Sequence, residues 1–324
     1  MLNRPQGFFT IRKKWLKVAV AAVLLSVAMA VSPFQLQWIP LAWYWARLPA
    51  QPEGASLRLA GYRVVIDAKV IEGIRGELSG ITYNPQTDTL FVAVERNEIA
   101  EITTEGRLLR KIPVTGVGDS EDIVHVGGNV FALVDERAKQ VYWLYLDSET
   151  QAIDAAEAPG MALDVLPSRR NKNLEAVTWD AQKQRLWIGK EKSPMRIIYI
   201  DGLTQWRGDA LATRNEARSI KQPMRLSILE WKSRQDYGLF LRDLSALFWH
   251  APTRHLLLLS DESAALSEYS PEGELVDIML LWKGRHGLAR AISQAEGVTM
   301  DGRGDLYIVS EPNLFYRFEP EAAR

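Results

Sequence analysis

Five copies of one short pattern predict how this chain folds. They read ELSGITY (77–83), DSEDIVH (119–125), NLEAVTW (173–179), DLSALFW (243–249) and QAEGVTM (294–300). Each copy opens with an acid or an amide, has Ser or Glu two residues later, and continues with a small residue or Asp and then an aliphatic residue. A pattern that recurs along a chain is typical of repeat folds, in which each repeat forms one structural unit.

A polar turn and a second apolar run follow each copy, and together they form the pattern of a β-hairpin. All five second runs end in an acid: Glu95, Asp135, Glu191, Asp261 and Glu311. Third runs follow in most copies, and the copies start 42, 54, 70 and 51 residues apart. Because propeller blades take about 40–50 residues, this spacing predicts an all-β, five-bladed β-propeller with insertions in two loops.

The ring must also be closed. Only about 30 residues follow Gln294, which is too few for a whole blade. The apolar run 61–71 precedes the first copy and is predicted to supply the outer strand of the last blade, which removes exposed sheet edges. Two alternatives remain open, a β-sandwich and a sixth, degenerate blade within residues 203–242.

The N-terminus has the pattern of a membrane element. Basic residues precede the apolar run 18–31, and no charged residue occurs from Val18 until Arg47. A spanning helix needs about 20 apolar residues, which 15–33 provides if Lys17 snorkels. Aromatic residues at 38 and 43–45 resemble an interfacial belt. These features favour an uncleaved signal-anchor helix; a signal peptide cleaved after 28–30 and a buried helix of a soluble domain are the alternatives.

This interpretation sets the expected domains and location. Residues 1–46 would form a cytoplasmic basic stub and the anchor, 47–58 a linker, and 59–324 the propeller. Positive charge before the apolar run predicts a single pass through a bacterial inner membrane, contacted through residues 15–46, with the propeller in the periplasm.

Composition excludes several classes of function. The formal net charge is -1, so no basic surplus indicates a nucleic-acid partner. The chain has no cysteine, which excludes disulfides, zinc–thiolate sites and cysteine nucleophiles.

Propeller geometry brings the repeated acids together. Innermost strands line a central channel, and the second strand runs back antiparallel, so the start of one and the end of the other share a face. The predicted mouth therefore carries an inner ring from the repeated copies, with the acids that end the second runs around it. Carboxylates a few ångströms apart repel by about 1–4 kcal/mol per pair, which favours protonation or a bound cation.

The oxygen-only donor set suits Ca²⁺ better than zinc or copper. The predicted ligands are Glu121, Glu175 and Glu296, supported by Glu77, Asn173 and Asp243. The alternative is that these acids are solvated and pair with nearby basic residues: Arg96, Arg137, Lys190 and Lys192.

The five copies, their order and the hydrophobic leader resemble the SdiA-regulated family of bacterial β-propeller proteins over residues 61–319. The resemblance implies a five-bladed propeller with a calcium site in the channel, distantly similar to paraoxonase and strictosidine-synthase-like propellers, and implies no established biochemical activity. Ala176 and Ala246 stand where the family usually has Gly, and Asp122 replaces that Gly in the second copy.

Two functions remain open. One is a non-catalytic, calcium-binding module that docks an unknown small ligand or protein at the acidic mouth. The other is a calcium-dependent hydrolase of esters or lactones, which needs a general base near the metal. Of the four histidines, only His286 is predicted to lie in a loop that can reach the mouth, and a carboxylate such as Asp261 or Glu262 is the alternative base.

Overall fold

The computed structural model describes residues 38–48, 55–95, 97–163, 174–192, 194–203, 226–234 and 236–321. The chain divides into two units, Met1–Ala46 and Arg47–Arg324. The helix α3 (Trp38–Arg47) is described at the end of the first unit. Among the described residues, no helix is both long enough and apolar enough to cross a membrane. The predicted anchor at 15–33 falls outside them.

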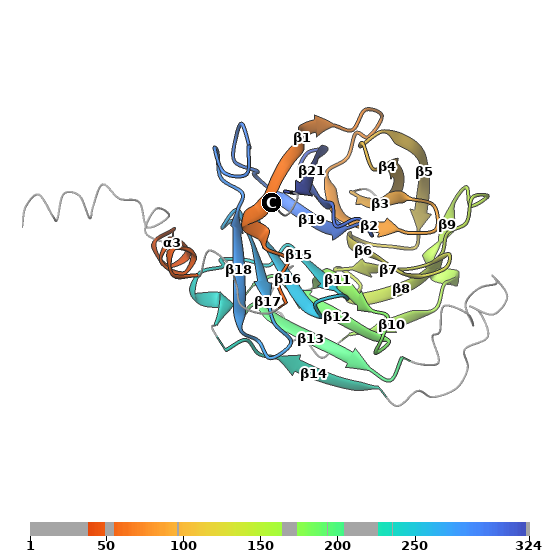
Figure 1. Cartoon of the computed structure of the whole chain (residues 1–324). Helices are drawn as coiled ribbons and strands as arrows, with labels where there is room; N and C mark the ends of the chain where they lie inside the picture. The colour runs from red at the N-terminus through yellow and green to blue at the C-terminus, as the bar shows by residue number, and fades with distance from the viewer. Residues whose placement is uncertain are drawn as a thin grey trace, which may run out of the picture. The chain divides into compact units, whose positions relative to one another are not determined.

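The second unit is a five-bladed β-propeller, as predicted (Figure 1). Blade 1 contains β2 (Leu78–Asn84), β3 (Thr89–Val94), β4 (Glu98–Thr103) and β5 (Leu108–Thr115), with the short β9 (Ile153–Asp154) added parallel to β5. Blade 2 contains β6 (Ser120–Gly127), β7 (Val130–Asp135), β8 (Gln140–Tyr145) and β10 (Gly160–Ala162). Blade 3 contains β11 (Leu174–Asp180), β12 (Arg185–Lys190), β13 (Arg196–Asp201) and β14 (Ser227–Trp231).

Blade 4 contains β15 (Ala246–His250), β16 (His255–Ser260), β17 (Ala265–Tyr269) and β18 (Leu275–Leu280). Blade 5 contains β19 (Ala295–Met300), β20 (Leu306–Ser310), β21 (Leu314–Pro320) and β1 (Tyr62–Val70). The innermost strands are β2, β6, β11, β15 and β19, each formed by one copy of the repeated pattern, and each contacts the next around a closed ring. In the described part of 203–242, β14 is the outer strand of blade 3, so these residues form no sixth blade.

The predicted closure by 61–71 is confirmed. β1 pairs antiparallel with β21, from Tyr62 opposite Pro320 to Val70 opposite Leu314. The N–H of Glu321 also donates to the carbonyl of Gly61, at 2.8 Å. β1, from the start of the propeller sequence, therefore completes blade 5, whose other strands come from the end of that sequence (Figure 1).

The core lies between the faces of neighbouring blades. One buried cluster joins Phe91 and Ile99 of blade 1 to Ile123 and Phe131 of blade 2. The rings of Phe91 and Phe131 lie 4.5 Å apart, centroid to centroid. Apolar residues therefore occupy both faces of inner and middle strands, which explains their nearly continuous hydrophobic runs.

Threonine hydroxyls join the innermost strands of three pairs of blades. Thr82 accepts the N–H of His125 at 2.9 Å, and Thr178 accepts the N–H of Trp249 at 2.9 Å. Thr299 accepts the N–H of Tyr83 at 3.2 Å, which links blade 5 to blade 1. All three threonines are the sixth residue of a repeat copy, so the repeat itself supplies these bonds.

We expect Thr178→Val to lower the free energy of unfolding by about 1–3 kcal/mol, because it leaves the buried N–H of Trp249 without an acceptor. Urea denaturation of the variant measures this loss. Thr87→Val is the matched control, since Thr87 is exposed in a turn, and it should change stability by less than about 0.5 kcal/mol. Equal effects of the two changes would contradict the role given to the hydroxyl.

A segment before β1 is held on blade 4 by a buried acid that the sequence patterns did not indicate. Glu268 of β17 is 0% exposed and accepts hydrogen bonds from the Ser56 hydroxyl at 3.0 Å and from the Leu57 N–H at 2.9 Å. Nδ1 of His255 donates to the same carboxylate at 2.6 Å. The last residues of the predicted linker 47–58 thus contact the propeller.

Candidate cation site in the channel

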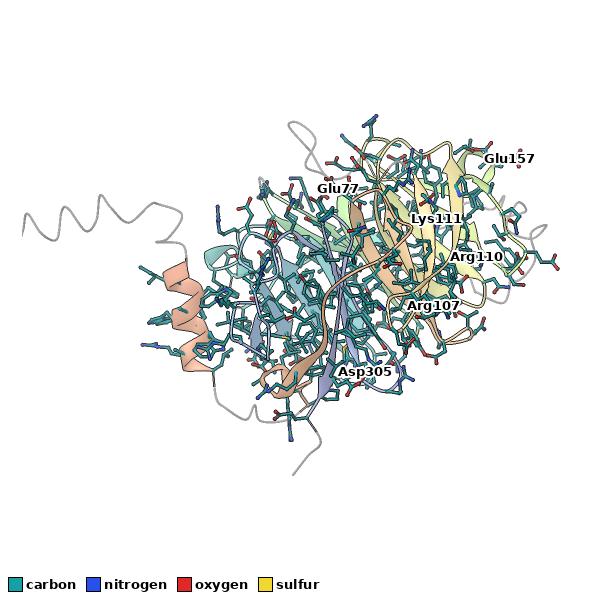
Figure 2. All side chains as sticks on the ribbon, turned by 90° about the horizontal axis from the view of Figure 1, so that it is seen from above. Glu77, Arg107, Arg110, Lys111, Glu157 and Asp305 are labelled. Atoms are coloured by element: carbon teal, nitrogen blue, oxygen red, sulfur yellow. The ribbon has the colours of Figure 1, made fainter. Side chains whose placement is uncertain are left out.

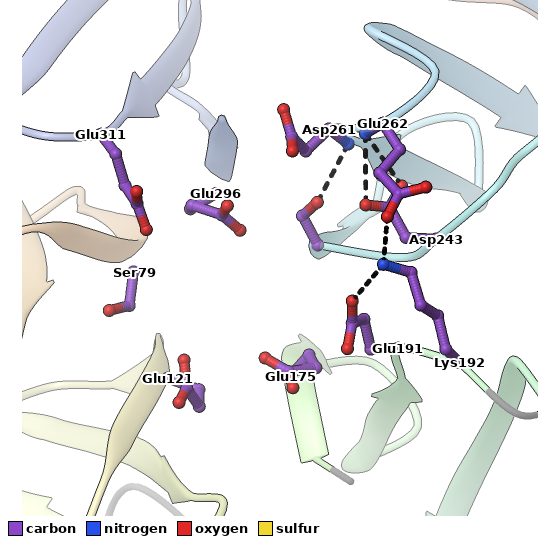
Figure 3. Close-up of a pocket in the computed structure, with 11 residues that line it drawn as sticks. Ser79, Glu121, Glu175, Glu191, Lys192, Asp243, Asp261, Glu262, Glu296 and Glu311 are labelled. Atoms are coloured by element: carbon purple, nitrogen blue, oxygen red, sulfur yellow. Dashed lines mark hydrogen bonds and ion pairs between the residues drawn. The ribbon is translucent and has the colours of Figure 1, made fainter. Parts of the chain in front are cut away.

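The third residues of the repeat copies line one cavity of about 250 Å³ at the mouth of the channel (Figure 3). Its lining contains eight carboxylates, two hydroxyls and one ammonium group: Ser79, Glu121, Glu175, Glu191, Lys192, Asp243, Ser245, Asp261, Glu262, Glu296 and Glu311. Figure 2 labels Glu77 on this face of the propeller and Asp305, from the turn after β19, on the opposite face. The acids that line the cavity range from Glu121 to Glu311 and so come from distant parts of the sequence.

A β-bulge near the start of three inner strands presents the three glutamates to the cavity. In β11, Leu174 lies opposite Lys190 and Ala176 opposite Gly189, so Glu175 is the extra residue of the bulge. Leu174 and Ala176 are fully buried, whereas Glu175 lines the cavity. The pairing shifts in the same way around Glu296 in β19 and in the stretch of β6 that contains Glu121.

Burial and mutual repulsion raise the pKa values of these carboxyls. Desolvation is the larger cause in each case. Burial, followed by the negative charge of Asp119, raises the pKa of Glu121 to about 8. Burial, followed by the negative charge of Glu121, raises the pKa of Glu175 to about 10. Burial, followed by the negative charge of Asp261, raises the pKa of Glu296 to about 9. In the absence of a cation, the three carboxyls are therefore mainly protonated at neutral pH.

Glu121, Glu175 and Glu296 have no hydrogen bond or ion pair with the residues that the structure describes, and no dashed line reaches them in Figure 3. Three of the four basic residues proposed as their partners bond to other groups. Arg137 pairs with Asp119 at 3.3 Å, and Lys190 donates to the carbonyls of Lys192 and Pro194. Arg96 lies outside the described residues.

Lys192 neutralises one wall of the cavity. Its Nζ lies 2.7 Å from Glu191 and also pairs with Glu262, whose other oxygen lies 2.9 Å from Arg242. Burial acts to lower the pKa of Lys192, but the hydrogen bonds to Glu191 and Glu262 outweigh it and raise the pKa. The positive charge of Lys192 is therefore already balanced on the side of blades 3 and 4.

Of the acids that end the second runs, Glu191, Asp261 and Glu311 line the cavity. Asp135 does not. It is buried and accepts the N–H groups of Gly118, Asp119 and Ala138, so it holds a turn together. Glu95 is exposed and also lies outside the lining. The expected outer ring is therefore incomplete on the side of blades 1 and 2.

The three supporting ligands predicted from the sequence differ in placement. Asp243 lines the cavity, where it accepts hydrogen bonds from the Ser260 hydroxyl and the Glu262 N–H, and burial raises its pKa to about 6. Glu77 is exposed and lies outside the lining, although its charge helps to raise the pKa of Glu311. Asn173 falls outside the described residues.

One acid that the repeat pattern did not indicate lies close by. Oxygens of Asp119, Glu121 and Glu136 lie within 4.8 Å of one another, and Glu136 is buried. Glu136 directly follows the acid that ends the second run, as Glu262 does in the fourth copy. In both copies, two consecutive acids at the end of the second run were the sequence signal that could have indicated Glu136 and Glu262.

No histidine lines the acidic cavity. The expectation that the His286 loop reaches the mouth was wrong: its Nδ1 bonds the carbonyl of Tyr62 at 3.0 Å, and its own carbonyl accepts the N–H of Val64. Both partners are on β1, the outermost strand of blade 5, because the loop packs against the closing strand. His125 lines a smaller cavity of about 90 Å³ toward the other ends of the inner strands.

The donor set fits a hard cation. Carboxylate and hydroxyl oxygens are the ligands that Ca²⁺ prefers, and the described lining has no nitrogen or sulfur donor suited to softer metals. The three carboxyls without partners supply the negative charge that such an ion needs.

The family expected from the sequence pattern is found by comparison with known families. The family described as SdiA-regulated matches residues 54–319. Among solved structures, a chain of a nidogen–laminin complex is 12% identical, with a TM-score of 0.43, and the match covers 72% of each chain. A streptogramin B lyase structure is 11% identical, with a TM-score of 0.40, over 81% of this chain and 75% of that one.

Proposed function

This chain belongs to the SdiA-regulated family, and from that premise we propose that it is a calcium-binding β-propeller that presents an acidic channel mouth to a ligand or protein. One observation carries the proposal. Glu121, Glu175 and Glu296 face the same cavity with raised pKa values and without partners among the described residues.

Glu121, Glu175 and Glu296 would hold the ion, and Asp243, Ser79 and Ser245 line the same cavity as further oxygen donors. A bound cation would replace three protons and remove the repulsion between carboxylates from three blades. Its expected effect is to tie those blades together at the axis.

Binding is favoured over hydrolysis for this site. A metal-dependent hydrolase places a general base beside the metal. The histidine expected to serve as that base packs on the outer strand of blade 5 instead. The lining carboxyls remain the only titratable acids and bases on the described walls apart from the paired Lys192.

The location belongs to the same proposal. A basic stub followed by an uncharged apolar run supports a single-pass anchor in a bacterial inner membrane, with the propeller in the periplasm. Free calcium at micromolar to millimolar levels outside the cytoplasm would suit a site of moderate affinity.

We expect calcium to raise the melting temperature of the full-length protein by roughly 5 °C or more at a hundredfold excess over its Kd, since such an excess contributes about 2.7 kcal/mol. Thermal melts with Ca²⁺, with Mg²⁺ and with EDTA measure this, and titration calorimetry gives the affinity. Glu175→Gln should remove the calcium increment. It should also raise the melting temperature in EDTA, because it removes a carboxyl whose burial in the folded protein disfavours the charged form.

Glu95→Gln is the matched control, because Glu95 is an exposed acid outside the cavity. It should leave the calcium increment unchanged. A wild-type protein whose melting temperature and calorimetric signal do not respond to calcium would refute the proposed function.

A further inference from the structure

Asp122 is the one large residue at a position where the other repeat copies have Gly or Ala. The equivalent residues are Gly80, Ala176, Ala246 and Gly297. Asp122 is 3% exposed and does not line the acidic cavity, so it is not one of the candidate ligands.

The carboxylate of Asp122 joins blade 2 to blade 3. Its Oδ1 accepts the N–H of Ile123 at 2.8 Å, and its Oδ2 accepts the N–H of Val177 on β11, also at 2.8 Å. Both bonds are buried. Hydrogen bonds to a buried charged or polar carboxyl contribute more than exposed ones, so this link fixes the two inner strands relative to each other.

The same side chain fits closely against blade 1. A Cβ added to Gly80 would lie 2.7 Å from the Cα of Asp122 and closer still to its Oδ1. Real Cβ atoms do not approach other atoms so closely, so Gly80 is required by its neighbour. Asp122 is therefore seated between the inner strands of both adjacent blades.

Asp122 takes the place of a threonine link that blade 2 lacks. Blades 1, 3 and 5 each offer a threonine hydroxyl to the next blade, but the sixth residue of the second copy is Val124. The fourth copy has Phe248 there, and Asp261 accepts the N–H of Ala295 at 3.3 Å at that interface. Acids thus join the two pairs of blades that lack the threonine.

We propose that Asp122 is a positioning residue that sets the spacing between Glu121 and Glu175 across the interface of blades 2 and 3. Glu121 precedes Asp122 in β6, and Glu175 lies two residues before Val177 in β11. The bond from Val177 to Asp122 therefore joins β6 and β11 at residues next to or two removed from the glutamates. This inference rests on the proposed function, because the spacing matters only if the two carboxylates share an ion.

Spacing should affect the choice of ion more than it affects folding. Mg²⁺ demands short, near-octahedral coordination, whereas Ca²⁺ accepts longer and more variable distances. A channel whose two glutamates are held at one spacing by a fixed link would favour Ca²⁺ if that spacing suits the larger ion, and release of the link would reduce that preference. A residue that only stabilised the fold would not change the ratio of the two affinities.

The test is titration calorimetry of the full-length protein with Ca²⁺ and with Mg²⁺, well below the melting temperature. Asp122→Gly gives blade 2 the residue found in two other copies, so it should fold, and we expect its calcium Kd to rise by about tenfold or more with a smaller Ca²⁺/Mg²⁺ preference. Asp122→Asn keeps an oxygen for the Val177 N–H and should restore most of the affinity.

Gly80→Ala provides a second route, because its Cβ would displace Asp122 without changing it. It should weaken calcium binding in the wild-type background. Its effect should be smaller in the Asp122→Gly background, where the clash with the carboxylate is gone and the 2.7 Å approach to the Cα of residue 122 remains. Ala246→Gly, the equivalent position in blade 4, is the matched control and should leave the affinity ratio unchanged.

The two proposals fail in different ways. Wild-type protein that binds no calcium would overturn both the proposed function and the positioning role. Wild-type protein that binds calcium, with Asp122→Gly equal to it in affinity and in ion preference, would overturn the positioning role alone.

Discussion

Raising the pH from 5.5 to 8 in EDTA should lower the free energy of unfolding by several kcal/mol. The pKa values of Glu121, Glu175 and Glu296 are raised to about 8, about 10 and about 9 in the folded protein, against about 4.3 in an unfolded chain. Between these values the folded state holds protons that the unfolded state has lost. Stability therefore falls as the pH rises, by at most about 1.4 kcal/mol per pH unit for each group.

Urea denaturation at a series of pH values measures this slope. Calcium should reverse it, because the cation replaces the protons, so its stabilising effect should be larger at pH 8 than at pH 5.5. A variant with all three glutamates changed to glutamine is the control and should lose most of the dependence. Equal stability of the wild type at the two pH values would show that the carboxyls remain charged in the folded protein.

Glu268→Ala should lower the free energy of unfolding by about 3–5 kcal/mol. The change leaves Ser56, the N–H of Leu57 and His255 without their shared acceptor in a site where Glu268 itself is fully buried. Removing one partner of a buried polar cluster lowers the free energy of unfolding by more than the intact cluster contributes to it. The reason is that the remaining polar groups stay buried without a hydrogen-bond partner.

Chemical denaturation gives the loss, and limited proteolysis shows whether residues 55–61 are released from blade 4. Glu274→Ala is the matched control in the same blade: Glu274 pairs with Arg234 at 2.6 Å, but both side chains are more than half exposed. Its loss should stay below about 1 kcal/mol. A similar small loss for Glu268→Ala would mean that the segment is held by other contacts.

The repeat pattern was sufficient to predict the fold, because each copy forms an innermost strand and each following run forms the next strand of its blade. It also predicted the closing strand, since a closed ring leaves one run at the start without a blade. The convergence of Glu121, Glu175 and Glu296 on one cavity followed from the same symmetry.

What the pattern missed depends on contacts that symmetry does not describe. Asp135 matches Glu191 in sequence but accepts three backbone N–H groups, two from the loop before β6 and one from the turn after β7. His286 was misplaced because its loop packs on β1, which lies more than two hundred residues earlier in the chain. Glu268 carries no signal in its own repeat copy, because two of its partners, Ser56 and Leu57, lie more than two hundred residues earlier in the chain.

Blade 5 takes strands from both ends of the propeller sequence, which determines when a newly synthesised chain can finish folding. β1 ends at Val70, but its partner β21 begins only at Leu314. During synthesis from the N-terminus, β1 therefore waits with an unsatisfied edge until almost the whole chain has been made. A premature stop before Leu314 would leave two open edges, on β1 and on β20, each able to capture a strand from another copy.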